Sequence, residues 1–82
     1  MTVFELKIAL VEILAEESGP EVDWDQIENL SERTYVRLTE PDTPQDFPQE
    51  SVIGYLAGFR RRRGDPQFCE QQREWLRMYL QG

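Results

Sequence analysis

The sequence predicts an all-α protein, a compact bundle of four short helices that forms one domain over residues 1–82. Three observations predict this class. Four segments carry apolar residues at helical spacing, proline or glycine stands at the breaks between them, and no segment alternates apolar and polar residues as a strand does. A chain of 82 residues has room for one domain with a small core.

The first helix is expected over residues 2–17. Thr2 and Glu5 have the spacing of a capping box, and Gly19-Pro20 ends the segment. On a helical projection, acidic residues occupy one narrow stripe and apolar residues cover most of the remaining circumference. The stripe consists of Glu5, Glu12 and Glu16, and the apolar residues are Val3, Phe4, Leu6, Ile8, Ala9, Leu10, Val11, Ile13, Leu14 and Ala15.

This apolar surface is wider than the arc of about 100° that a single core-facing stripe requires. We therefore expect part of the helix to stay uncovered by the rest of the bundle and to bind a partner protein or a second copy of the chain. The residues expected to carry this contact are Leu6, Leu10 and Ile13. The alternative is that the other three helices enclose the first one completely.

The second helix is expected from Asp23, with Gln26 as its capping partner, to about Thr39. One side of it is apolar and the other is polar, as in a helix at the surface of a bundle. Residues 40–48 contain three prolines and three acids, a composition that predicts an extended acidic loop.

The third helix is expected to begin near Pro48 and to continue through the arginines before it ends at Gly64. Asp65 followed by Pro66 predicts the N-cap and first residue of a fourth helix, which extends to about Gln81. The apolar stripes of these two helices contain Val52, Ile53, Tyr55, Leu56 and Phe59 in the third, and Phe68, Gln72, Trp75, Leu76 and Tyr79 in the fourth.

Charge is unevenly distributed along the chain, whose net charge is −7. Residues 1–50 hold thirteen acids and three bases, a net charge of −10, whereas residues 51–82 hold three acids and six bases, a net charge of +3. A protein with two oppositely charged regions is suited to charged protein partners, while its overall negative charge opposes the approach of nucleic acid.

The sequence favours a cytoplasmic setting. Cys69 is the only cysteine and has no partner for a disulfide within the chain. Glu5, Lys7 and Glu12 interrupt the longest apolar stretch, so the N-terminal segment does not have the pattern of a signal peptide. No run approaches the roughly 20 apolar residues of a membrane span, and we expect no insertion into a membrane.

Residues for most enzymatic chemistry are missing. The chain has no histidine and one cysteine, which excludes the usual zinc sites and catalytic triads. Glycine-rich phosphate loops are missing as well. Two carboxylates acting together remain formally possible, but no pair of acids lies where burial is predicted. We expect a protein that is not an enzyme, with no catalytic residue, metal or cofactor.

Four consecutive arginines, Arg60, Arg61, Arg62 and Arg63, are the most unusual local feature. They create a strong positive potential within about one helical turn. In one interpretation they neutralise a helix C-terminus and pair with the acidic half of the same chain. In a second they bind an acidic partner protein, and in a third they bind nucleic acid, to which the net charge is opposed.

Three short motifs are similar to the C-terminal part of colicin immunity proteins, which are small acidic four-helix inhibitors of nucleases. They are Pro48-Gln49-Glu50-Ser51-Val52-Ile53, Phe59-Arg60 and Gly64-Asp65-Pro66-Gln67-Phe68, about a quarter of the chain. The paired tyrosines of that family's inhibitory segment are missing here. The resemblance implies a helical protein that inhibits another protein by binding it.

The combined expectation is a small non-enzymatic adaptor or regulatory protein. It is expected to bind another protein, or itself, through an apolar helix face and a charged surface. The alternatives are an accessory protein that binds nucleic acid through residues 60–63 and an acidic inhibitor of the immunity-protein type.

Overall fold

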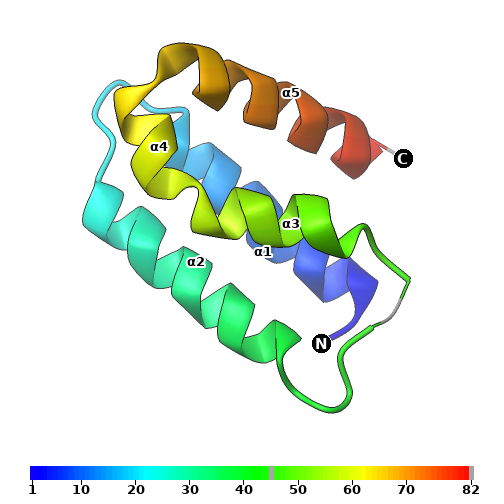
Figure 1. The fold of residues 1–82 in the computed structure, drawn as a ribbon. Coiled ribbons are helices and arrows are strands. Elements are labelled where there is room, and N and C mark those ends of the chain that lie inside the picture. The colour runs from blue at the N-terminus through cyan, green and yellow to red at the C-terminus, as the bar shows by residue number, and fades with distance from the viewer. Residues whose placement is uncertain (45, 82) are drawn as a thin grey trace.

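The computed structural model describes residues 1–44 and 46–81 of the protein, and within them it contains five helices and no strand (Figure 1). The predicted all-α bundle is confirmed. Four helices are longer than two turns and one is a short helix of six residues. The helices are α1 (Val3–Glu17), α2 (Trp24–Leu38), α3 (Gln49–Ala57), α4 (Phe59–Gly64) and α5 (Pro66–Gln81).

The start of α1 is the predicted capping box. The amide of Glu5 donates to Thr2 Oγ1 at 3.1 Å, and the amide of Thr2 donates to Glu5 Oε1 at 3.1 Å. The Thr2 amide and the guanidinium of Arg37 lower the pKa of the Glu5 carboxyl below its ordinary value. The charged carboxylate therefore stabilises this helix start, and that contribution is lost as the pH falls through the lowered pKa.

Aspartate side chains begin two further helices, as predicted. The amide of Gln26 donates to Asp23 Oδ1 at 3.2 Å at the start of α2. The amide of Phe68 donates to Asp65 Oδ1 at 3.1 Å at the start of α5, whose first residue is Pro66. These contacts satisfy helix amides that have no partner inside their own helix.

The prediction of one continuous third helix is wrong, because the segment is interrupted at Gly58 between α3 and α4. Gly58 has φ −88° and ψ 5°, values between those of a helix and a turn. A Cβ atom at Gly58 would lie 2.8 Å from the carbonyl oxygen of Gly54 and 2.9 Å from Gln72 Oε1. The missing side chain therefore allows α5 to approach the interruption closely, and this places Gln72 beside the residues of α4.

The helices enclose one core. α1 contacts α2 and α5, α2 contacts α3 and α4, and α4 contacts α5, so that α2 and α3 lie side by side in Figure 1. Buried residues from four helices form the apolar centre: Leu6, Leu10, Ile13, Ile27, Leu30, Val52, Tyr55, Leu56 and Leu76. The aromatic residues Trp24, Trp75 and Tyr79 are half-buried and pack against this centre.

Leu6, Leu10 and Ile13, which the sequence analysis assigns to partner contact, are core residues instead. All three are fully buried within the chain. They follow one another at intervals of four and three residues, and this spacing places them on the side of α1 that faces the other helices. They are therefore not available to a partner in this fold.

The segment between α2 and α3 has no regular structure in its described residues, 39–44 and 46–48, as its prolines predict. The prediction of an extended loop also covers Gln45, which lies outside the described residues. Among the helices that the structure describes, none has both the length and the apolar character needed to cross a bilayer.

Candidate functional site

The four arginines of residues 60–63 do not share one environment, because each successive side chain on a helix turns by about 100°. The side chain of Arg62 is fully buried, whereas those of Arg60 and Arg61 are 83% and 67% exposed. Arg60 pairs with Glu28 at 3.3 Å, and Arg61 lies 3.7 Å from Asp65 and stacks on the Phe68 ring.

Arg62 is therefore part of the interior and is not a partner-binding residue, contrary to the sequence-based assignment. Arg60, Arg61 and Arg63 remain at the surface. The first interpretation of the run, pairing with the acidic half of the chain, describes Arg60 and Arg62, because Glu28 and Glu17 both belong to that half. A surface of four adjacent guanidiniums is not formed.

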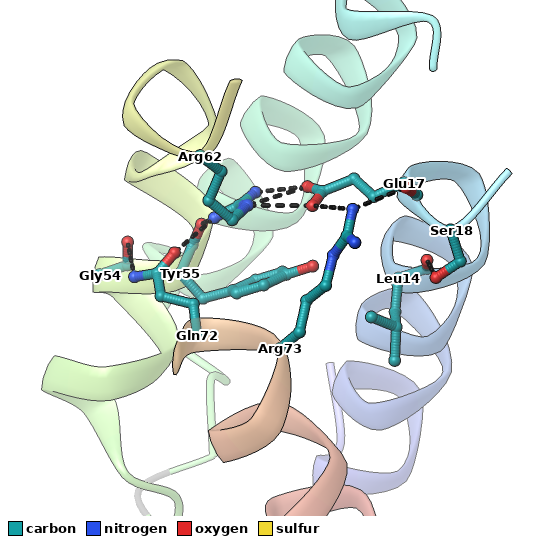
Figure 2. Close-up of polar contacts among 8 residues, drawn as sticks. All are labelled: Leu14, Glu17, Ser18, Gly54, Tyr55, Arg62, Gln72 and Arg73. Carbon is teal, nitrogen blue, oxygen red and sulfur yellow. Dashed lines mark hydrogen bonds and ion pairs between the residues drawn. The ribbon is translucent and has the colours of Figure 1, made fainter. Parts of the chain in front are cut away.

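Arg62 belongs to a buried polar cluster that joins four helices, which we call the Glu17 cluster (Figure 2). It consists of Glu17 at the end of α1, Tyr55 in α3, Arg62 in α4, and Gln72 and Arg73 in α5. Arg62 binds the carboxylate through two nitrogens, with Nη2 to Oε1 at 2.6 Å and Nε to Oε2 at 3.0 Å. This paired geometry is the strongest that a guanidinium and a carboxylate adopt.

The Nη1 group of Arg62 also has hydrogen-bond partners. Nη1 donates to the carbonyl oxygen of Tyr55 and, at 2.7 Å, to Gln72 Oε1. The guanidinium carbon lies 4.0 Å from the centre of the Tyr55 ring. Gln72 in turn donates to the carbonyl oxygen of Gly54 at 3.3 Å. The ion is thus held by hydrogen bonds on one side and by an aromatic face on the other.

Arg73 completes the cluster from α5. Its Nη2 donates to the carbonyl oxygen of Glu17 at 2.6 Å and lies 3.6 Å from Glu17 Oε2. The backbone contact satisfies one of the carbonyl groups that a helix leaves free at its C-terminus. The Glu17 cluster thus contains one carboxylate and two guanidiniums, and both members of its closest pair are shielded from water. This arrangement holds helix ends together.

Glu17 is not among the residues predicted to carry a function, although the sequence contains a signal for it. Leu6, Leu10, Ile13 and Glu17 continue one series of four- and three-residue intervals along α1. A buried ion pair is indicated when an acid at the end of one helix and a base in another helix are each in register with core residues. The four identical arginines concealed which of them had this register.

Tyr55 provides a test of the cluster by pH. Burial raises the pKa of its hydroxyl well above the ordinary value, and the negative charge of Glu17 adds to the effect. Because the folded pKa lies above the unfolded value of about 10, the protonated hydroxyl favours the folded state below that pH. This contribution is lost as the pH rises above about 10. We expect the urea midpoint to fall in this range and the tyrosinate absorbance of Tyr55 to appear only with unfolding.

The control is Tyr55→Phe, which removes a buried hydroxyl that has no hydrogen-bond partner among the described residues. This variant is expected to be about as stable as the parent at pH 7 and to lose less stability between pH 9 and pH 11. An identical alkaline loss in both proteins would show that Tyr55 is not responsible.

The second candidate site is the side of α1 that faces away from the core. Phe4, Ile8 and Val11 are 73%, 52% and 50% exposed, and Ala15 continues the same line. We call these four residues the outer seam of α1. On a helical projection these four residues lie within an arc of about 60°. The centre of this arc is about 200° from the centre of the arc that holds Leu6, Leu10 and Ile13.

The outer seam confirms that the apolar arc of this helix is only partly covered, and the alternative of complete enclosure is wrong. On one side of it lies the predicted acidic stripe of Glu5, Glu12 and Glu16, whose residues are all exposed. On the other side, Lys7 is half-buried with its Nζ 5.0 Å from the centre of the Tyr79 ring. The outer seam is therefore an exposed apolar line with acids along one edge and a base along the other.

Comparison with known proteins found no matching family model, no similar curated protein and no similar solved structure. The fold and its sites define a class only: a small all-α bundle that is closed by a buried ion cluster and carries an uncovered apolar helix face. The similarity to colicin immunity proteins rests on the short motifs of residues 48–53, 59–60 and 64–68, which lie at the start of α3, at the start of α4 and at the junction of α4 and α5.

Proposed function

We propose that the protein is a small protein-binding module that docks a basic amphipathic helix of another protein on the outer seam of α1. One observation carries the proposal: the most apolar helix of the bundle has a second apolar line, opposite its core face, with large side chains exposed to solvent. Burial of such side chains contributes about 25 cal/mol per Å², which is sufficient for a specific contact when several are covered together.

The charge beside the seam selects the kind of partner. Glu5, Glu12 and Glu16 follow one edge, and Lys7 is the only base among residues 2–17. Glu5 is paired with Arg37 of α2, whereas Glu12 and Glu16 make no ion pair within the described part of the chain. Two copies of α1 placed seam to seam would bring three acids and one base from each chain to the contact. A partner helix with lysines or arginines beside its apolar line matches the acidic edge better than a second copy of α1 does. The net charge of −7 also increases the rate at which such a basic helix approaches.

The test uses two synthetic amphipathic peptides with the same leucine line, one flanked by lysines and one by glutamates. We expect the lysine peptide to bind with micromolar affinity and the glutamate peptide not to bind, as measured by isothermal titration calorimetry. Ile8→Glu is expected to weaken binding at least tenfold, because it places a charge at the centre of the buried contact. Ile8→Glu is more acidic than the parent protein, so nonspecific attraction of the lysine peptide would become stronger, whereas docking on the outer seam would become weaker.

Met78→Glu is the matched control, because Met78 is also an exposed apolar residue but lies on α5. It is expected to leave peptide binding unchanged. Equal weakening by both variants, or equal binding of both peptides, would contradict docking on the outer seam. If sedimentation shows a dimer that Ile8→Glu makes monomeric, a second copy of the chain is the occupant and the proposed basic partner is wrong.

A further inference from the structure

An apolar groove lies between α2 and the α3–α4 segment, and no residue of α1 contributes to it. Its volume is about 310 Å³, and its lining includes Ser31, Tyr35, Val36, Leu56, Ala57 and Phe59. Tyr35 and Val36 are among the large exposed apolar residues of the molecule. This volume is at the lower end of the range for sites that hold small molecules, and the predominantly apolar lining is typical of them.

A buried hydroxyl in the lining has no partner. Ser31 is 1% exposed, and its Oγ makes no hydrogen bond to the residues that the structure describes. Thr34, one turn further along the same helix, donates its hydroxyl to the carbonyl oxygen of Leu30 at 2.9 Å. A buried polar atom without a hydrogen bond is costly, so Ser31 Oγ is a group that a bound molecule can satisfy.

The charge of the lining is negative. Glu32 is the only ionisable side chain of the lining apart from the phenol of Tyr35, and it makes no ion pair within the described part of the chain. Three bases lie around the groove but do not line it: Arg33 and Arg37 share a neighbouring hollow with Glu32 and Val36, and Arg60 lies over the Phe59 ring at 5.7 Å. Arg37 is paired with Glu5 and Arg60 with Glu28. The polar end of a ligand is therefore expected to donate hydrogen bonds and to carry a positive charge.

We propose that this groove binds a small aromatic amine. Its ring would pack against the aliphatic side chains and the rings of Tyr35 and Phe59, and its ammonium group would contact Glu32. Ser31 Oγ, which is buried beneath the groove, would become a second contact when its side chain turns toward the ligand. Aromatic faces add to the attraction for a cation, and a flat ring with a two-carbon amine tail matches a groove of about 310 Å³. Tryptamine is a suitable probe, and indole-3-propionate is the matched acid with the same ring.

The test is a titration followed by amide chemical shifts in ¹⁵N-labelled protein. We expect tryptamine to shift the amides of Ser31 and Ala57 saturably, with a dissociation constant on the order of 1 mM. Indole-3-propionate is expected to give no saturable shift at these residues. Ala57→Leu fills the groove from an exposed position and is expected to abolish the shifts, while the helical circular-dichroism spectrum is unchanged.

Two further variants separate the polar contacts. Glu32→Gln is expected to weaken tryptamine binding about two- to fivefold, the effect of an exposed charge pair. Ser31→Ala is expected to weaken binding and to leave the thermal midpoint unchanged or slightly higher, because it removes a buried hydroxyl without a partner. A lower midpoint would show that this hydroxyl is satisfied within the fold.

Several results would overturn the proposal: tryptamine shifts elsewhere on the protein, equal binding of the acid, or full binding by Ala57→Leu. Saturation of the groove by a peptide with an aromatic side chain, while tryptamine fails, would assign it to a protein partner instead. Ile8→Glu on α1 is expected to leave tryptamine binding unchanged. The groove and the outer seam can thus fail independently of each other.

Discussion

Glu17→Gln is expected to destabilise the protein by about 3–5 kcal/mol, the cost of leaving a buried charge without its partner. The substitution keeps the size of the side chain and removes its charge, so that the fully buried guanidinium of Arg62 loses the only counter-ion it has among the described residues. Small domains have a total stability of about 5–15 kcal/mol. We therefore expect the variant to be largely unfolded at moderate urea concentrations, as measured by circular dichroism at 222 nm.

Glu16→Gln is the matched control, since Glu16 is the exposed neighbour of Glu17 on the same helix and undergoes the same chemical change. Its effect is expected to stay within about 0.5 kcal/mol, as is usual for surface substitutions. A loss below about 1 kcal/mol for Glu17→Gln would mean that water replaces the lost charge and that the cluster is open to solvent in solution.

Leu10→Ala is expected to cost about 2–5 kcal/mol, because Leu10 is fully buried and the change removes core contacts and leaves a cavity. Ile8→Ala, on the opposite side of α1, removes a side chain that is half exposed and is expected to cost less than about 1 kcal/mol. Urea unfolding of the two variants under the same conditions measures this difference. Similar losses would show that both sides of α1 are covered, which is the case in a dimer joined through the outer seam.

The helix starts could be predicted from the sequence because their signals are local. Thr2 with Glu5, Asp23, and Asp65 with Pro66 each act on amides within three residues, so their effect does not depend on the rest of the fold. Gly58 was missed because a glycine inside a helix costs only about 1 kcal/mol, and the reason for the interruption is the close approach of Gln72 from a distant helix.

The side of α1 that faces the core could not be predicted because its apolar residues extend almost completely around it. Both Leu6, Leu10 and Ile13 and the outer seam have helical spacing, and only contact with α2 and α5 distinguishes them. The same limit applied to Arg62. Four identical neighbours have equal propensities, and Arg62 differs from the others only in its register with the core, where Glu17 and Gln72 reach it.

The Glu17 cluster also has a consequence for the order in which the chain folds. Glu17 contacts Arg62 and Arg73, which are 45 and 56 residues further along the chain. Closing such long loops is slow compared with forming a helix or a helical hairpin. While the chain is synthesised, α1 and α2 can pair early, but the carboxylate at the end of α1 stays hydrated until α4 and α5 arrive. The packing around the end of α1 is therefore completed only when the C-terminal half has folded against it. For this reason the two halves are not separable folding units.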